Sequence, residues 1–309
     1  ASDGRPVERN YTVGVDVGGT KVLAVRVSAS GELEASAVRP MPGRTAPEAD
    51  VETAVADAAR DVFLTHPPAA VGVSAAGLVD AAGEHYLFGA HLPWRDAPVR
   101  RRVEGLLGVP VVMDNDANCA AWAELTAGAA RGRRSVVLVT IGTGIGGALV
   151  LGGRLVRGAH GVAGEFGHMQ AVPGGLECEC GLRGCWEQYC SGRALERVTR
   201  VALGRHLTGP EVTALALEGD EVAREAFGSV GRWLGVGTAA LVSAFDPELV
   251  VVGGGVSAVG DLLLAPAREA LRSSLQGTDH RPVPDLVPAA LGPEAGAVGA
   301  ALLARDGRP

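Results

Sequence analysis

The feature that most constrains the fold is a strand–glycine turn–strand pattern that occurs twice. In residues 11–40, "YTVGVDVGGTKVLAVRVSASGELEASAVRP", apolar β-branched runs flank "GG" and "SASG", which are both typical turn sequences. The pattern returns in residues 135–158, "SVVLVTIGTGIGGALVLGGRLVRG". We interpret it as a coarse internal duplication, in which a meander of three strands opens each half of the chain.

The segments that follow each meander combine helical and strand-like patterns. Helical spacing of apolar residues occurs in 46–66 and 228–245, and a small-residue helix is expected at 294–305. Buried strands that run into small-residue turns are expected within 69–80 and 247–260. Because 309 residues exceed a typical single core, we predict two α/β domains with a cleft between them.

The segment 109–130, "VPVVMDNDANCAAWAELTAGAA", predicts a strand, a polar elbow and a helix that Asp or Asn side chains cap. We place the domain boundary within it. The N-terminal α/β domain then spans residues 1–117 together with the C-terminal segment 294–309, and the C-terminal α/β domain spans 118–293.

Composition argues against several classes of protein. No apolar run approaches the ~18 residues that span a bilayer. The first ten residues, "ASDGRPVERN", lack the apolar core of a secretory signal. We therefore expect a cytoplasmic, reducing compartment, in which stable disulfides are disfavoured, and no membrane partner. The net charge of −7 and the lack of a basic block argue against nucleic acid as a partner.

Three glycine turns follow predicted strands: "DVGGT" (16–20), "GTGIGG" (142–147) and "GGGVS" (253–257). Glycine lets backbone N–H groups approach an anion closely, which is how such turns bind phosphates. Neither the Rossmann spacing nor the Walker A pattern is present. Asp16 at the first turn suggests Mg²⁺, held directly or through water. An ordinary hairpin with a capping aspartate is the alternative. Lys21, the only lysine among 28 basic residues, ends this stretch.

The elbow "MDNDANC" follows an apolar strand, so Asn115 and Asp116 should emerge at its carboxyl end, facing the cleft. A carboxylate there could accept the proton of a hydroxyl that attacks a γ-phosphoryl group. The alternative, which the residues alone favour, is that both side chains merely cap the following helix.

Four of the five cysteines lie within residues 177–190, "ECECGLRGCWEQYC". A disulfide, a redox pair, a metal site and chance are the possible explanations. Cysteines separated by one residue bridge poorly. Three thiolates and one imidazole suit tetrahedral Zn²⁺ with no open position. We therefore favour a structural zinc site made of His168, Cys178, Cys180 and Cys185, in a loop that spans 164–190.

Six motifs occur in one order: "DVGGTK", "NDANCAAWAE", "TIGTGIGG", "GEFGH", "CECGLRGCWE" and "VVVGGGV". Together they resemble the ROK family (repressors, open reading frames and kinases), most of all its bacterial glucokinases, from about residue 11 to residue 302. The resemblance implies an actin/hexokinase-like fold of two ribonuclease-H-like α/β domains with an interdomain active-site cleft. It also implies transfer of the γ-phosphoryl group of ATP to the 6-hydroxyl of D-glucose, giving glucose 6-phosphate and ADP.

The resemblance further implies a role for each residue that matches a family motif. Asp116 is the general base. The implied sugar contacts are Gly77, Asn115, Asp116, Glu165, His168 and Glu187. The implied contacts of the nucleotide and its Mg²⁺ are Asp16, Gly18, Gly19, Thr20, Lys21, Thr143, Gly144, Gly254 and Gly255. One departure is Ala76, where many members have proline; we expect the loop to persist with different stiffness.

The zinc-bearing members of the family carry the same Cys/His arrangement. One nitrogen of His168 would then bind the metal while the other faces the sugar, so that coordination fixes the tautomer. Cys119 and Cys190 are expected to be buried small residues. We also expect a homo-oligomer, either a dimer or a tetramer.

Two kinds of alternative stay open. The shared motifs contact hydroxyls common to several hexoses, so a kinase for mannose, fructose or an N-acetylhexosamine is one alternative, and polyphosphate could replace ATP. A sugar-responsive transcription repressor is the other. Only 15 residues precede Asp16 and the chain is acidic, so we expect no helix-turn-helix domain.

Overall fold

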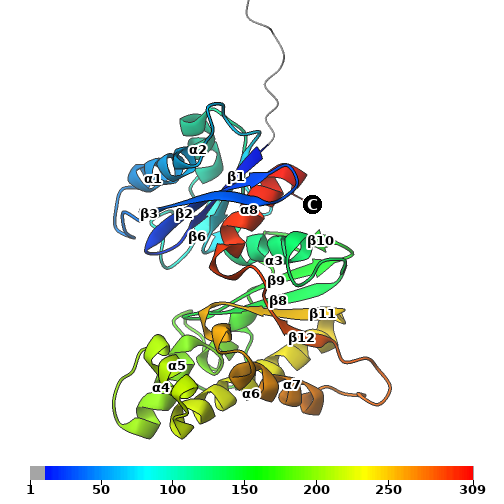
Figure 1. Cartoon of the computed structure of the whole chain (residues 1–309). Coiled ribbons are helices and arrows are strands. Elements are labelled where there is room, and N and C mark those ends of the chain that lie inside the picture. Colours follow the sequence, from blue (N-terminus) through cyan, green and yellow to red (C-terminus); the bar gives the residue numbers. More distant parts are fainter. Residues whose placement is uncertain (1–10, 309) are drawn as a thin grey trace, which may run out of the picture. The chain divides into compact units, whose positions relative to one another are not determined.

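The structure, a computed structural model, describes residues 11–308, which divide into two compact units (Figure 1). Unit 1 combines the chain up to Arg131 with Arg157–Ala163 and the segment from Glu294 onwards. Unit 2 combines Gly132–Val156 with Gly164–Pro293. Residues 1–10 and 309 lie outside the described residues. The expectation that no secretory signal is present concerns residues 1–10, so it also falls outside the described part of the chain.

The division of the chain differs from the predicted boundary after residue 117. Unit 1 keeps the whole of helix α3 (Asp116–Ala127), because α3 packs along helix α8 (Ala295–Asp306). The segment Arg157–Ala163 also belongs to unit 1, although the prediction assigned it to the C-terminal domain. Sequence pattern locates the helix, but only its packing partner decides which unit it joins.

Unit 1 is built on a mixed sheet with the strand order β3–β2–β1–β4–β7. The strands are β1 (Tyr11–Val17), β2 (Lys21–Ser28), β3 (Leu33–Pro40), β4 (Val71–Ala75) and β7 (Val111–Asn115). β1, β2 and β3 are antiparallel, which confirms the meander predicted for the first half, and β4 and β7 run parallel to β1. The carboxyl ends of β1, β4 and β7 therefore lie at one edge of the sheet.

Alternate residues of β1 face two different layers of unit 1. Val13 and Val15 share a buried core with Val51 of α1 (Glu48–Asp61). Gly14, on the other face, lies against Ala297 of α8. The remaining elements are helix α2 (Val99–Leu107) and a small ribbon of β5 (Leu78–Val79) and β6 (Tyr86–Phe88).

Unit 2 repeats the plan with a sheet of order β10–β9–β8–β11–β12. The strands are β8 (Val136–Ile141), β9 (Ile145–Leu151), β10 (Arg154–Leu155), β11 (Leu249–Gly253) and β12 (Asp285–Pro288). β8, β9 and β10 form the antiparallel meander, and β11 and β12 run parallel to β8. The two sheets have the same order and the same strand directions, which confirms the internal duplication.

The helices of unit 2 cover one large apolar core. They are α4 (Gly192–Leu203), α5 (Gly209–Glu218), α6 (Glu221–Phe245) and α7 (Asp261–Ser274), with short 3₁₀ helices η1 (Phe166–His168), η2 (Trp186–Gln188) and η3 (Gly255–Val259). A further 3₁₀ helix, η4 (Gly292–Glu294), lies where the chain passes from unit 2 to unit 1. Helix α6 begins before its predicted start at residue 228, because the Asp220 side chain caps it by accepting a 2.8 Å hydrogen bond from Ala223 N. No helix within residues 11–308 is both long and apolar enough to cross a bilayer.

Candidate active site

The β1–β2 turn (residues 18–20) carries the first predicted phosphate site, in unit 1. Asp16, one residue before the end of β1, accepts a 2.5 Å hydrogen bond from Ser74 Oγ on β4. Burial raises the pKa of Asp16, although the Ser74 hydrogen bond and the charge of Lys21 act in the opposite direction. Gly19, Thr20 and Lys21 are exposed. The turn therefore presents open backbone beside a carboxylate that one hydroxyl holds in place.

The β7–α3 elbow places Asn115 and Asp116 at the sheet edge where β1 and β4 also end. Asn115 is the N-cap of α3, and its Oδ1 accepts hydrogen bonds from Ala117 N and Asn118 N at 2.9 and 3.1 Å. The half-buried Asp116 also accepts from Ala117 N, at 3.0 Å, through Oδ1. Capping of this helix is thus mainly the task of Asn115.

The loop after β4 is held against the same elbow. Asn115 Nδ2 donates a 2.9 Å hydrogen bond to the carbonyl oxygen of Gly77. Gly77 has φ +136°, and a Cβ there would lie 2.2 Å from Tyr86 Oη, so only glycine fits. Tyr86 Oη donates to Ala76 O at 2.7 Å. Burial raises the pKa of Tyr86, and the charge of Asp116 raises it further. The hydrogen bond from Tyr86 therefore holds the loop that contains Ala76 in place.

Asp114 is a buried residue of this region that the sequence analysis missed. Its Oδ1 accepts from Asn115 N and Asn118 Nδ2, both at 2.9 Å. Its Oδ2 accepts from Arg157 Nε at 2.7 Å and from Arg308 Nη2 at 3.3 Å. The Asp114 side chain is 2% exposed and that of Arg157 is 11% exposed. The signal in the sequence was a charged residue directly after the apolar run "VVM", because a charged residue in a buried strand needs partners.

In unit 2, a pocket of about 580 Å³ opens beside the β8–β9 turn; we call it the α4–α5 pocket. Its size lies in the range of sites for small-molecule ligands. Two predicted nucleotide contacts, Thr143 and Gly255, line it, whereas Gly144 and Gly254 are not among its lining residues. The other lining residues were not among the predicted contacts: Gly142 and Val256, with Gly192, Arg193, Leu195 and Glu196 of α4, and Gly209, Pro210 and Thr213 of α5.

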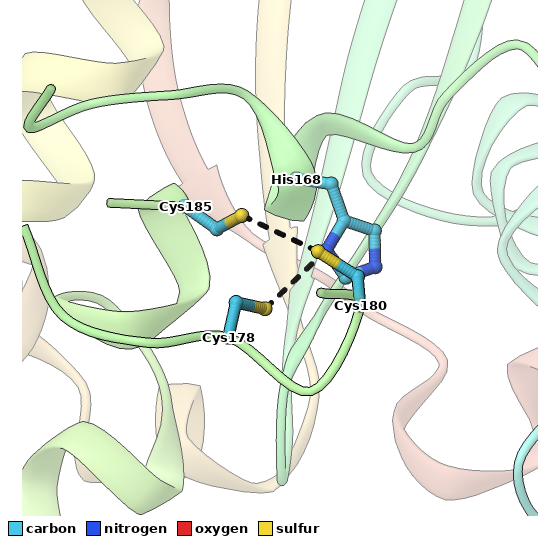
Figure 2. Close-up of side chains that lie close together, drawn as sticks. All are labelled: His168, Cys178, Cys180 and Cys185. Carbon is cyan, nitrogen blue, oxygen red and sulfur yellow. Dashed lines mark hydrogen bonds between the residues drawn. The ribbon is translucent and has the colours of Figure 1, made fainter. Parts of the chain in front are cut away.

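The thiol cluster, which comprises His168, Cys178, Cys180 and Cys185, forms in the loops around η1 and η2 (Figure 2). Figure 2 shows the three sulfur atoms and the imidazole gathered around one point, and their ligand atoms all lie within 4.8 Å of one another. Cys180 Sγ lies 3.6 Å from Cys185 Sγ, and Cys178 Sγ lies 3.8 Å from His168 Nδ1. Ligands of a tetrahedral zinc ion, with Zn–S bonds of about 2.3 Å, are about 3.8 Å apart. The side chains therefore fit a tetrahedral metal.

Two carboxylates flank the imidazole of this cluster. Glu187 Oε1 lies 3.9 Å from His168 Nδ1, on the side of the thiols, and Glu165 Oε2 lies 3.9 Å from Nε2. Glu187 Oε2 also accepts a 3.3 Å hydrogen bond from Ile145 N, and a Cβ at Gly144 would lie 2.4 Å from the same oxygen. Partial burial raises the pKa of Glu165. The thiol cluster is therefore tied to the β8–β9 turn through Glu187.

The predicted residues thus fall into two sets. Unit 1 brings together Asp16, Gly18, Gly19, Thr20, Lys21, Gly77, Asn115 and Asp116 at one sheet edge. Unit 2 gathers Glu165, His168 and Glu187 at the thiol cluster, with Thr143 and Gly255 at the α4–α5 pocket. Cys119 and Cys190 are buried free thiols, as expected.

Known proteins match this chain over nearly its whole length. The sequence model of the ROK family matches residues 12–307. The glucokinase of Streptomyces coelicolor is 43% identical over 315 aligned residues, which cover 96% of this chain and 98% of that protein.

Solved structures agree with the sequence matches. The crystal structure of a ROK family glucokinase from Streptomyces griseus, in complex with glucose and AMPPNP, has a TM-score of 0.86 and 41% identity, and covers 96% of this chain and 100% of its own. A ROK hexokinase from Thermus thermophilus has a TM-score of 0.81 and 39% identity, and covers 95% and 97%. The mixed α/β sheets share the fold of these structures, which confirms the expected actin/hexokinase-like class.

Proposed function

This chain belongs to the ROK family, and from that premise we infer that it is a glucokinase, which transfers the γ-phosphoryl group of ATP to the 6-hydroxyl of D-glucose. The observation that carries the inference is the 43% identity to the Streptomyces coelicolor glucokinase over nearly the whole of both chains. The Streptomyces griseus glucokinase structure is a complex with glucose and AMPPNP, which supports glucose and ATP as the substrates.

Asp116 is the proposed general base. It stands half-buried at the carboxyl end of β7, where a substrate hydroxyl can reach it, and Asn115 rather than Asp116 carries most of the capping of α3. As the sugar oxygen attacks the γ-phosphorus atom, the Asp116 carboxylate orients the hydroxyl and accepts its proton, and ADP leaves.

Asn115 can contact the sugar in only one way. Both hydrogen bonds that its Oδ1 accepts come from the α3 backbone, and one Nδ2 hydrogen goes to Gly77 O. One Nδ2 hydrogen is left for a ligand, so Asn115 acts as a donor to a sugar hydroxyl. The remaining proposed contacts are the Gly77 backbone, Glu165, His168 and Glu187.

Each unit carries its own proposed nucleotide contacts. In unit 1, Asp16 is the proposed anchor for the Mg²⁺ that accompanies ATP, and the exposed backbone of Gly19 and Thr20 binds phosphate oxygens beside it, with Lys21 as a nearby charge. In unit 2, the α4–α5 pocket is the proposed adenosine site, because its volume suits a nucleoside and it adjoins the turn residue Thr143. Gly144, Gly254 and Gly255 complete this side.

Zinc is the proposed resident of the thiol cluster, with His168, Cys178, Cys180 and Cys185 as its ligands. The convergence of three sulfur atoms and one nitrogen supports it, and the free thiols suit a reducing, cytoplasmic compartment. When bound, zinc supplies a rigid tie and no reactive water. His168 Nδ1 faces the thiols, so Nε2 is the nitrogen left to donate to a sugar hydroxyl.

A substrate panel tests the assignment. Each sugar (glucose, mannose, fructose, N-acetylglucosamine, N-acetylmannosamine) is offered with MgATP, and kcat/KM is measured from ADP release and from the sugar phosphate formed. Glucose should exceed every other sugar, and polyphosphate in place of ATP should be a poorer donor. A tenfold preference for an N-acetylated sugar would contradict the glucose assignment. The expected homo-oligomer is tested by light scattering on the same preparation.

A further inference from the structure

A second, smaller pocket of about 150 Å³ occurs in unit 2; we call it the arginine pocket. Its lining residues are Arg193, Glu196, Arg197, Arg200 and His206. Arg193 and Glu196 also line the α4–α5 pocket, so the two volumes adjoin. None of the motifs described above assigns a function to it.

The arginine pocket lies along one face of helix α4. Arg193, Arg197 and Arg200 are four and then three residues apart, which places them in one row on the helix surface. His206 joins them from the connection between α4 and α5. The pocket thus collects three guanidinium groups and an imidazole around a small volume.

Many arginines within residues 11–308 pair with carboxylates, as Arg39 does with Asp61 and Arg100 with Glu84. Within the described part of the chain, two of the three arginines of the arginine pocket have no carboxylate partner. Arg197 donates to a carbonyl oxygen, that of Gln188. For the exposed Arg200, no ion pair or side-chain hydrogen bond exists among residues 11–308.

The other charges of the arginine pocket do not neutralise these two guanidinium groups. Arg193 already pairs with Glu179 at 2.7 Å. Glu196 is the only carboxylate in the lining, and its Oε1 accepts a 2.8 Å hydrogen bond from Gly209 N at the start of α5. Burial lowers the pKa of Arg197, and the charge of Arg200 contributes to that shift. Like charges that lie close together repel unless an anion lies between them.

We propose that the arginine pocket is a phosphate-binding site, distinct from the site of the ATP phosphates. Planar guanidinium groups bind phosphate oxygens through paired N–H donors, and a row of them on one helix face supplies several such donors. A volume of about 150 Å³ admits a tetrahedral oxyanion and is too small for a nucleoside. The phosphate is either free or carried by a ligand whose remainder occupies the adjoining α4–α5 pocket.

Calorimetric titration of the full chain with inorganic phosphate, at constant ionic strength, tests the proposal. R200A is the informative variant, because Arg200 is exposed and lines only the arginine pocket. R232A is the matched control: Arg232 lies on α6 and pairs with Glu225 at 2.5 Å on the surface. R200A should weaken phosphate binding about tenfold, R232A less than twofold, and R197A/R200A should abolish it. Equal affinity in wild type, R200A and R232A would overturn the proposal.

Nucleotides separate the two sources of the phosphate. If it is free, inorganic phosphate still binds the ADP-saturated protein, and R200A leaves the ADP affinity unchanged. If it is carried by a ligand, adenosine 3′,5′-bisphosphate binds more tightly than AMP, and R200A removes that difference. An equal loss of ADP and phosphate affinity in R200A overturns the proposal, since the arginines would then serve the nucleotide's own phosphates. Wild-type protein that shows neither phosphate binding nor the bisphosphate gain also overturns it.

Discussion

The β1–β2 turn of unit 1 and the β8–β9 turn of unit 2 occupy the same place in two sheets of the same order, yet they carry different chemistry. In unit 1, Asp16 pairs in register with Ser74 on the parallel neighbour β4. The matching position in unit 2 is Thr140, which pairs with Gly253 on β11. The β1–β2 turn thus follows a carboxylate with a hydroxyl partner, whereas the strand position before the β8–β9 turn carries no charged side chain.

The two units also hold their site residues in different ways. In unit 1, the buried carboxylate of Asp114 ties the β7–α3 elbow to Arg157 and Arg308. In unit 2, Glu187 ties the thiol cluster to the β8–β9 turn, and Glu165 lies on the other side of the His168 imidazole. The comparison teaches that a duplicated backbone fixes where site residues lie. Single side chains decide whether a turn carries a charge, and whether ion pairs or a cluster of thiols and an imidazole lie beside it.

The largest expected effect is that of D116N in unit 1. The amide keeps the shape and can still accept a hydrogen bond, but it cannot take up the proton of the sugar hydroxyl. We expect kcat to fall about 10²–10⁴-fold. Glucose affinity should stay within a few-fold and the thermal midpoint close to wild type. Steady-state kinetics at saturating glucose and ATP, with glucose calorimetry, measure this. Near-normal turnover would contradict the role of Asp116 as general base and leave it only the role of capping helix α3.

The contrast between the two turns is tested by D16A beside T140A. D16A removes the proposed anchor of Mg²⁺ and misaligns the phosphates, so kcat/KM for MgATP should fall about 10²-fold. T140A alters the equivalent position of unit 2 and should change the same constant less than threefold. Glucose binding without nucleotide should be normal in both variants. An equal loss of kcat/KM for MgATP in D16A and T140A would contradict the proposed difference between the two turns.

D114N tests how unit 1 holds its elbow. The change removes the negative charge from the buried ion pair of Asp114 with Arg157, whose side chain is 11% exposed, so we expect a loss of about 3 kcal/mol in the free energy of unfolding. The control is D246N, because Asp246 is 84% exposed and its pair with Arg281 should contribute less than about 1 kcal/mol. Urea titration, with each transition fitted separately, compares them. Similar losses in the two variants would show that the elbow does not depend on Asp114.

C180S tests the corresponding tie in unit 2 and has the smallest expected effect on catalysis. The variant should lose its zinc, about one equivalent per chain, and loosen the loop that bears Glu187. The KM for glucose should rise about tenfold, more than kcat falls. E177Q, which changes an 80% exposed neighbour of Cys178, should keep the metal. Elemental analysis measures the zinc content, and steady-state kinetics measure the KM for glucose. A wild-type protein that is fully active without metal would contradict the proposed zinc site.

Sequence by itself determined the elements whose signals are local. The meanders at 11–40 and 135–158 follow from β-branched runs interrupted by glycine turns, and both are present. The thiol cluster follows from spacing, because Cys178, Cys180 and Cys185 lie within eight residues and His168 is close by in the chain. The strand, elbow and helix around Asn115 can likewise be predicted from the sequence, since a polar N-cap residue after an apolar strand is a local signal.

Only the tertiary structure decided which distant residues meet. Ser74 reaches Asp16 through the parallel register of β1 and β4, 58 positions apart in the chain. Arg157 and Arg308 reach Asp114 from 43 and 194 positions away. The α4–α5 pocket forms only when two helices pack beside the β8–β9 turn, so the sequence motifs did not predict most of its lining residues. The physical reason is that periodicity and turn chemistry act between neighbours, whereas strand register and helix packing are set by the burial of the whole core.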